Sequence, residues 1–121
     1  MSLTPQAREY LTEKRFAVLA TINASGVPQQ TVMWYELRGD TIVMNTTTTR
    51  VKGRNLARDN RISICVPDGY RFVTVTGEAR LDADHATSQE DIHRLAIRYN
   101  GEEEAARQMV EQFSAQERVS I

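Results

Sequence analysis

Residues 16–45, FAVLATINASGVPQQTVMWYELRGDTIVMN, decide the fold expected for this chain. An apolar, β-prone run at residues 16–22 is followed by the turn sequence NASG and then by a second run, QQTVMWYEL, which starts at Gln29. The turn sequence RGD leads into a third run, TIVMN. Such short connections can join antiparallel neighbours, whereas parallel strands need long crossovers. We therefore expect three antiparallel strands.

The chain beyond residue 60 adds strands of the same kind. ISICV at residues 62–66 is a fourth strand, and the turn sequence PDG follows it. FVTVTGEARL at residues 72–81 is a fifth strand, whose alternation predicts one buried face. RVSI, at the end of the chain, has the character of a sixth strand that is just beginning. Closing such a sheet removes exposed edges, so we expect a mainly β fold with helices (α+β), built as an antiparallel barrel; periodicity alone leaves a sandwich open.

Helices are expected at four places. Thr4 and Pro5 are typical of an N-cap and a first helical residue. A short helix is expected between Thr49 as its cap and Asn60 as its stop, with Val51, Leu56 and Ala57 facing inward. Two amphipathic helices follow, and their inward positions are Ile92, Leu95, Ala96 and Tyr99 in the first and Ala106, Met109, Val110 and Phe113 in the second. We expect the helices to cover the open side and the ends of the barrel.

The composition indicates one globular domain, residues 1–121. The apolar runs are far shorter than the ~20 residues of a membrane span, and the N-terminal sequence is polar, so we expect a cytoplasmic protein that does not bind membranes. The single cysteine, Cys65, lies in an apolar run and is expected in the core. A pI near 6.1 argues against a nucleic-acid-binding protein, although the segment 50–61 carries five cations.

The segment NTTTTRVKGRN at residues 45–55 leaves a strand and enters a helix. Backbone N–H groups at a helix start, hydroxyl groups and two cations, Arg50 and Lys52, together favour an anion such as a phosphate. These two cations converge only if Arg50 still lies in the loop, because residues i and i+2 of a helix diverge. A solvated helix face preceded by a threonine-rich loop is the structural alternative.

Other kinds of site find less support. His85 and His93 fit neither a calcium loop nor a zinc site in their spacing, so we expect no metal site. Ser25 has no context of a hydrolytic triad. Since we also find no acid–base pair, the catalytic residues stay unknown, which is compatible with a cofactor that carries the chemistry.

The run RVKGRNLARDNRISICV resembles the signature of the pyridoxamine 5'-phosphate oxidase-like split barrels, in particular the deazaflavin-dependent branch. FAVLATINASGVPQQTVMWY is similar to the opening hairpin of that family, and the sequence DGY at residues 68–70 stands where its members carry an aromatic residue. The resemblance covers residues 16–81. Family members usually continue with a full closing strand after RVSI, so the closing strand of this chain is expected to be short or cut.

The resemblance implies a homodimer of split barrels with a flavin or deazaflavin in a groove at the dimer interface. It places the cofactor phosphate at Arg50 and Lys52, helped by polar residues, which are Asn45, Thr46, Thr49 and Asn55. It places the ring system against the second and third strands, with the candidates Gln29, Thr31, Met33 and Trp34. Tyr70 would come from the partner region.

The resemblance favours the deazaflavin coenzyme F420 over FMN as the cofactor. It implies an oxidoreductase that transfers hydride from reduced F420 to a small conjugated organic acceptor. Arg54 and Arg58, at i and i+4, could attract the anionic tail of F420. An FMN-binding pyridoxamine 5'-phosphate oxidase-like protein and a non-catalytic flavin-binding module remain the alternatives.

Overall fold

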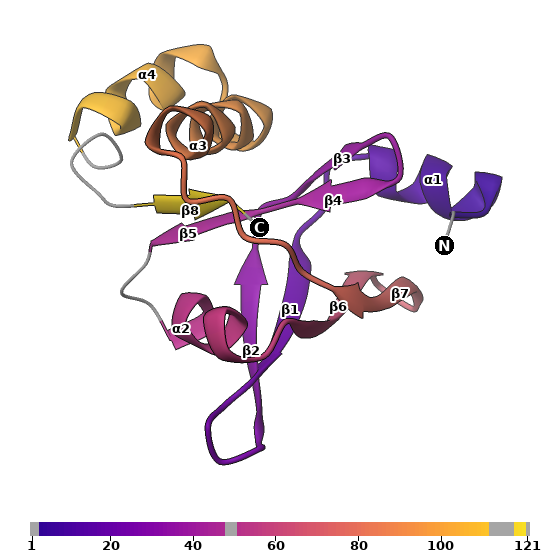
Figure 1. The fold of residues 1–121 in the computed structure, drawn as a ribbon. Coiled ribbons are helices and arrows are strands. Elements are labelled where there is room, and N and C mark those ends of the chain that lie inside the picture. Colours follow the sequence, from indigo (N-terminus) through magenta and orange to yellow (C-terminus); the bar gives the residue numbers. More distant parts are fainter. Residues whose placement is uncertain (1–2, 48–50, 112–117, 121) are drawn as a thin grey trace.

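The computed structural model describes residues 3–47, 51–111 and 118–120, and most elements expected from the sequence are present (Figure 1). In chain order they are α1 (Pro5–Thr12), β1 (Ala17–Ile22), β2 (Pro28–Met33), β3 (Glu36–Arg38), β4 (Thr41–Val43), β5 (Asn45–Thr47), α2 (Val51–Arg58), β6 (Arg61–Asp68), β7 (Arg71–Glu78), α3 (His85–Asn100), α4 (Glu102–Glu111) and β8 (Arg118–Ser120). Thr4 caps α1 as expected, since its Oγ1 accepts a hydrogen bond from the N–H of Ala7 at 3.1 Å.

Antiparallel pairing runs through the whole structure and confirms the expected split barrel. The four-stranded sheet has the order β2-β1-β6-β7, and the two-stranded ribbons β3–β4 and β5–β8 complete the barrel. Strands β1 and β2 pair from Ala17 opposite Met33 to Ile22 opposite Pro28. The strand expected at the end of the chain is β8, which pairs with β5.

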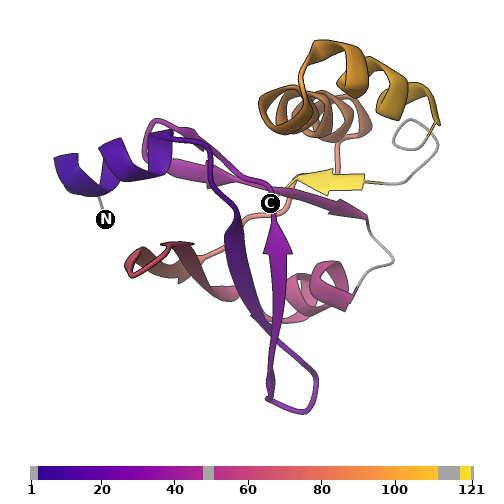
Figure 2. The same cartoon turned by 180° about the vertical axis from the view of Figure 1, so that it is seen from behind.

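The helices lie on different sides of the β5–β8 ribbon. Helices α3 and α4 cover one side of it, whereas α2 lies on the other side, next to the β1–β2 hairpin (Figure 1). The view from behind shows the same arrangement (Figure 2). One face of β5 therefore lies toward α3 and the other toward α2 (Figure 1).

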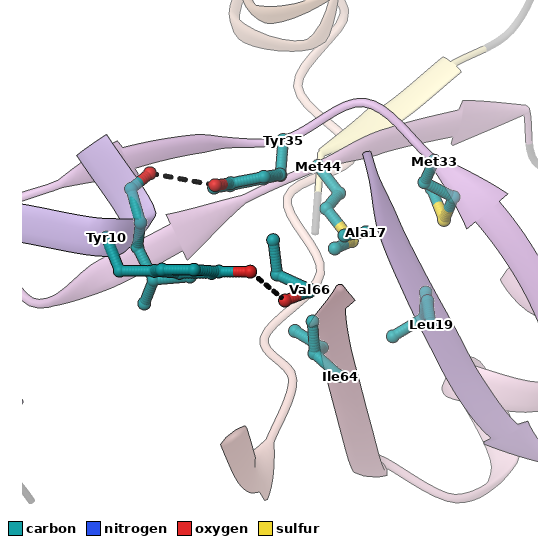
Figure 3. Close-up of a cluster of buried hydrophobic side chains, with 9 residues drawn as sticks. Tyr10, Ala17, Leu19, Met33, Tyr35, Met44, Ile64 and Val66 are labelled. Carbon is teal, nitrogen blue, oxygen red and sulfur yellow. Dashed lines mark hydrogen bonds between the residues drawn. The ribbon is translucent and has the colours of Figure 1, made fainter. Parts of the chain in front are cut away.

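The core fills the space between the four-stranded sheet and α1. Its side chains are Tyr10, Leu11, Ala17, Leu19, Met33, Tyr35, Met44, Ile64 and Val66 (Figure 3). The two tyrosines satisfy their hydroxyl groups inside it: Tyr10 donates to the carbonyl oxygen of Val66, and Tyr35 donates to that of Leu11, both at 2.8 Å. A second cluster, with Leu95 at its centre, joins α3 to α4.

Two strands that the sequence predicts as continuous are interrupted. The run that starts at Gln29 breaks at Trp34 and Tyr35, where the chain passes from β2 to β3 and into another sheet. The run TIVMN breaks at Met44 between β4 and β5. Tyr35 and Met44 are both fully buried in the core. Local alternation cannot reveal these breaks, because they serve contacts with distant residues.

The hairpin between the fourth and fifth strands is longer than expected. Strand β6 continues to Asp68, so the turn consists of Gly69 and Tyr70 and not of the sequence PDG. Gly69 has φ +61°, a conformation that glycine adopts without strain. The expectation that Cys65 lies in the core is wrong: its neighbours Ile64 and Val66 face inward, so Cys65 is half-buried on the outer face.

The inward faces of two helices also differ from the prediction. In α2, Val51 and Ala57 are exposed, and the buried residues are Lys52, Gly53, Asn55 and Leu56. Relative to the prediction, α2 is rotated about its axis so that Asn55 faces the sheet, where it donates a hydrogen bond to Thr21 of β1. In α4, Ala105 is buried and Ala106 is exposed; Phe113 lies outside the described residues. The inward positions Ile92, Leu95 and Ala96 of α3 are confirmed.

An ion-pair network fastens α3 to the β3–β4 ribbon. Arg38 contacts both Glu36 and Asp91, the latter at 2.8 Å. Arg94 contacts Glu36 at 2.9 Å. The side chains of Glu36 and Asp91 are mostly buried, so these pairs are less screened by solvent than surface pairs.

The stability of the fold is expected to fall on acidification, in part through Glu36. Burial by itself would raise the pKa of Glu36, but hydrogen bonds from Arg38 and Arg94 outweigh it and hold the pKa below its usual value. Such a carboxylate stabilises the fold above its unfolded-state pKa, and this contribution is lost as the pH falls through the folded-state value. Glu36→Gln should therefore cost stability near neutral pH and progressively less as the pH drops below about 4. Urea denaturation across this range measures the difference, and a pH-independent cost contradicts the assignment.

Leu19 tests the packing of the core. It is 1% exposed, and Leu19→Ala should lower the free energy of unfolding by about 2–5 kcal/mol, because it leaves a cavity. Val27→Ala, in the exposed β1–β2 loop, should change it by less than about 0.5 kcal/mol. Denaturant titration of both variants checks the contrast; equal effects would mean that the inner face is assigned incorrectly.

Candidate cofactor-binding site

Helix α2 turns a polar face toward the sheet. Lys52 is only 7% exposed, and Asn55, one turn later on the same face, is 3% exposed. The first turn of α2 holds no acidic residue, so no carboxylate there offsets the positive end of the helix dipole. This end of α2 therefore combines the features that favour a bound anion.

Polar side chains on the inner face of β1 and β2 meet this helix face. The register places Thr21 opposite Gln29, and Thr31 follows on the same face of β2. Thr21 donates to Gln29 Oε1 at 3.3 Å, and Gln29 Nε2 donates to Thr31 Oγ1 at 2.9 Å. Asn55 joins this chain through Thr21. We call the residues that share these hydrogen bonds the polar cluster: Thr21, Asn23, Gln29, Thr31, Asn55 and Arg58.

Strand β5 leads toward α2 and carries two further candidates. Thr46 is fully buried, and its Oγ1 has no hydrogen-bond partner among the described residues. Asn45 donates to the carbonyl oxygen of Ser88 in α3 at 2.9 Å. Neighbouring residues of a strand point to opposite faces, so Asn45 lies on the α3 side and Thr46 on the other. A buried hydroxyl without a partner, close to α2, fits a site that a polar ligand completes.

The candidates for contact with the ring do not all share one face. Gln29, Thr31 and Met33 lie on the inner face of β2, and Met33 is packed in the core. Trp34 instead stacks on Tyr99 of α3, with ring centroids 5.4 Å apart. The hydroxyl of Tyr99 accepts a hydrogen bond from the N–H of Tyr35 at 3.1 Å, which fixes the chain where β2 ends. Trp34 thus belongs to the contact with α3.

Tyr70 lies far from the polar cluster within one chain. It stands fully exposed at the tip of the β6–β7 hairpin, whereas Arg61, at the other end of the eight-residue strand β6, follows α2 closely. Eight residues of strand span roughly 25 Å. Within one chain, the length of β6 therefore separates Tyr70 from α2.

The cations around α2 have different roles. Arg50 and Thr49 lie outside the described residues. Arg58 donates to the carbonyl oxygen of Ile22 at 2.6 Å and to Asn55 Oδ1 at 2.9 Å, so its guanidinium group joins α2 to the end of β1. Arg54 is exposed. Both arginines are exposed, so their expected role of attracting the anionic tail of F420 stays a prediction.

The sequence did not point to Thr21 and Asn23 as members of the site. One signal was present: Thr21 is the polar residue at an inward position of an otherwise apolar strand, between Leu19 and the turn. A polar side chain that is fully buried needs a hydrogen-bond partner, and Asn55 provides it. Within the described ranges, no three His, Cys, Asp or Glu side chains gather as a metal site would require.

An antiparallel split barrel, with a buried lysine at the start of a helix and a polar cluster along the rest of that helix, defines a class of proteins suited to holding an anion. Residues 3–119 match the family described as "Pyridoxamine 5'-phosphate oxidase". The chain belongs to this family.

Solved structures share the fold over nearly the whole chain. The conserved hypothetical protein Rv2991 from Mycobacterium tuberculosis is 28% identical, with a TM-score of 0.76, over 99% of this chain and 78% of its own. A protein named F420 reductase is 25% identical, with a TM-score of 0.75, over 94% of this chain and 88% of its own. A heme storage protein from Vibrio cholerae, HutZ, shares the fold at 18% identity and a TM-score of 0.68, over 99% of this chain and 87% of its own. A search of curated proteins finds no match. None of the helices in the described part of the chain is long and apolar enough to cross a membrane.

Proposed function

We propose that this protein is an oxidoreductase that uses reduced coenzyme F420 to transfer hydride to a small conjugated organic acceptor. The observation that carries the proposal is the buried Lys52 at the start of α2, beside the polar cluster, in a chain of the pyridoxamine 5'-phosphate oxidase family. Further support comes from the similarity to a protein named F420 reductase over most of both chains.

The residues of this chain supply binding and orientation. Lys52, with Arg50 from the preceding segment, holds the cofactor phosphate, and the hydroxyl of Thr46 completes the polar environment. Thr31 and Gln29 present polar atoms on the inner face of β2 and would help to orient the ring system. When bound, reduced F420 would supply the hydride, which accounts for a site without an acid–base pair.

A second copy of the chain completes the site. The outer face of the four-stranded sheet exposes large apolar side chains, among them Val32 and Phe72. An exposed apolar surface of this kind is typical of an interface. The distant position of Tyr70 is a separate reason, because only a partner's hairpin can bring this side chain to α2.

Titration of the protein with F420 and with FMN at the same salt concentration tests the cofactor. We expect F420 to bind at least tenfold more tightly. Tighter binding of FMN by the same factor would make this an FMN-dependent member of the family, and failure to bind either cofactor would overturn the proposal. Steady-state oxidation of reduced F420 by added conjugated acceptors separates an enzyme from a non-catalytic binding module.

A further inference from the structure

The side-chain amide of Asn55 is fully occupied by contacts within the protein. Its Nδ2 donates to Thr21 Oγ1 at 3.1 Å and to Asn23 Oδ1 at 3.0 Å. Its Oδ1 accepts a hydrogen bond from Arg58 at 2.9 Å. An amide nitrogen has only two hydrogen atoms to donate, so neither is left for a ligand.

Arg58 fixes the direction of these hydrogen bonds. A guanidinium group only donates, so the atom of Asn55 that faces Arg58 has to be the oxygen, and the nitrogen has to face Thr21. The Thr21 hydroxyl accepts from Asn55 and can therefore give its own hydrogen to Gln29 Oε1. Gln29 then donates to Thr31. Arg58 thus sets the direction of the hydrogen bonds that run from Asn55 through Thr21 and Gln29 to Thr31.

These bonds connect α2 to β1 at the helix face that carries Lys52. Asn55 lies three residues after Lys52, on the same buried face, and Arg58 lies three residues after Asn55. The partners of both residues, Thr21, Ile22 and Asn23, are consecutive at the end of β1. The hydrogen bonds to the end of β1 therefore fix the rotation of α2 about its axis and its position on the sheet. They thereby also fix the position of Lys52.

We propose that Asn55 is a positioning residue: held by Arg58, it anchors α2 to the end of β1 and so sets Lys52 for the cofactor phosphate, without binding the phosphate itself. This inference rests on the proposed function, because it assigns the phosphate to Lys52. It differs from the direct role that the family resemblance gives to Asn55, since the atoms needed for that role are used inside the protein.

A double-mutant comparison with Lys52 tests the proposal. In the otherwise unchanged protein, Asn55→Ala should weaken binding of FMN or F420 about two- to tenfold. In a Lys52→Ala background, the same change should have little further effect, because Asn55 acts through Lys52. Arg54→Ala, on the exposed side of α2, is the matched control; it is read with FMN, which lacks the anionic tail of F420, and should show no such dependence. An equal loss from Asn55→Ala in both backgrounds, or no loss in either, overturns the proposal.

Hydrogen exchange of the cofactor-free protein supplies a second readout. Asn55→Ala and Arg58→Ala should each speed exchange of the α2 amides more than that of α4, and their combined effect should be less than additive. If Asn55→Ala folds poorly, Thr21→Val takes its place in this experiment. It removes one acceptor of the Asn55 amide, keeps the shape of the side chain, and should also speed exchange of the α2 amides. If the wild-type protein binds neither cofactor while these effects appear, the proposed function fails and the anchoring of α2 stands. Unchanged exchange in α2 overturns the anchoring itself.

Discussion

Lys52→Ala is expected to weaken binding of F420 and of FMN by tenfold or more. A hydrogen bond to a charged group contributes about 1.5–3 kcal/mol, and about 1.4 kcal/mol corresponds to a factor of ten in affinity. Lys52 is almost completely buried, so solvent screens its interaction with a phosphate less than that of a surface lysine. Fluorescence titration with each cofactor measures the loss. Arg50→Ala, in the segment before α2, should act in the same way.

Arg54→Ala is the matched control for Lys52→Ala. It removes the same charge from the same helix and is read with FMN, which lacks the anionic tail of F420; Arg54 is exposed, so its contribution to FMN binding is screened and should be small. Circular dichroism should confirm that Lys52→Ala keeps the fold, because the change removes a buried side chain. A folded Lys52→Ala variant with wild-type affinity would place the phosphate elsewhere.

The second large effect concerns the assembly of the protein. We expect the wild-type chain of 13.7 kDa to form a dimer at micromolar concentration, and Val32→Asp to convert it into a monomer. Val32 is 63% exposed on the outer face of the edge strand β2, in one row with Val18 and Cys65 of the two inner strands. A carboxylate there would be buried without a partner in the dimer, which is strongly unfavourable. Light scattering after size-exclusion chromatography distinguishes the two states.

Val27 provides the control for the dimer experiment. It has nearly the same exposure as Val32, 59%, but it lies in the β1–β2 loop and not on the sheet face. Val27→Asp should leave the dimer intact. The monomeric Val32→Asp variant should also bind the cofactor less tightly, because it lacks the partner's Tyr70. A wild-type monomer would contradict both the interface and the composite site.

The fold could be predicted in outline because its signals are local. The turn sequences between short apolar runs already specify antiparallel order, and the structure shows that order. The Thr4–Pro5 cap and the apolar spacing of α3 also depend only on neighbours in the sequence. The breaks at Tyr35 and Met44 could not be predicted in this way, since each residue leaves its strand to fill a core made of distant elements.

The candidate site, too, could be predicted from the sequence only in part. The cationic segment before and within α2 is visible in the sequence, and it motivated Arg50 and Lys52 as phosphate ligands. The face that α2 buries is not visible there: apolar periodicity favours Val51 and Ala57, whereas the structure buries Lys52 and Asn55. The hydrogen bonds between Asn55 and the end of β1 outweigh the burial of one valine side chain, because unpaired polar groups in the interior are costly.

The sequence by itself therefore determined the antiparallel strand order and the covering helices, and it motivated the segment that we propose for phosphate binding. Periodicity, turn chemistry and charge act over a few residues, so they can be recognised without a structure. Only the tertiary structure decided that Trp34 stacks on Tyr99, that Arg58 is an internal anchor, and that Asn55 faces Thr21. Those contacts join residues more than 30 positions apart, and their partners are chosen by how the layers pack, which no local pattern records.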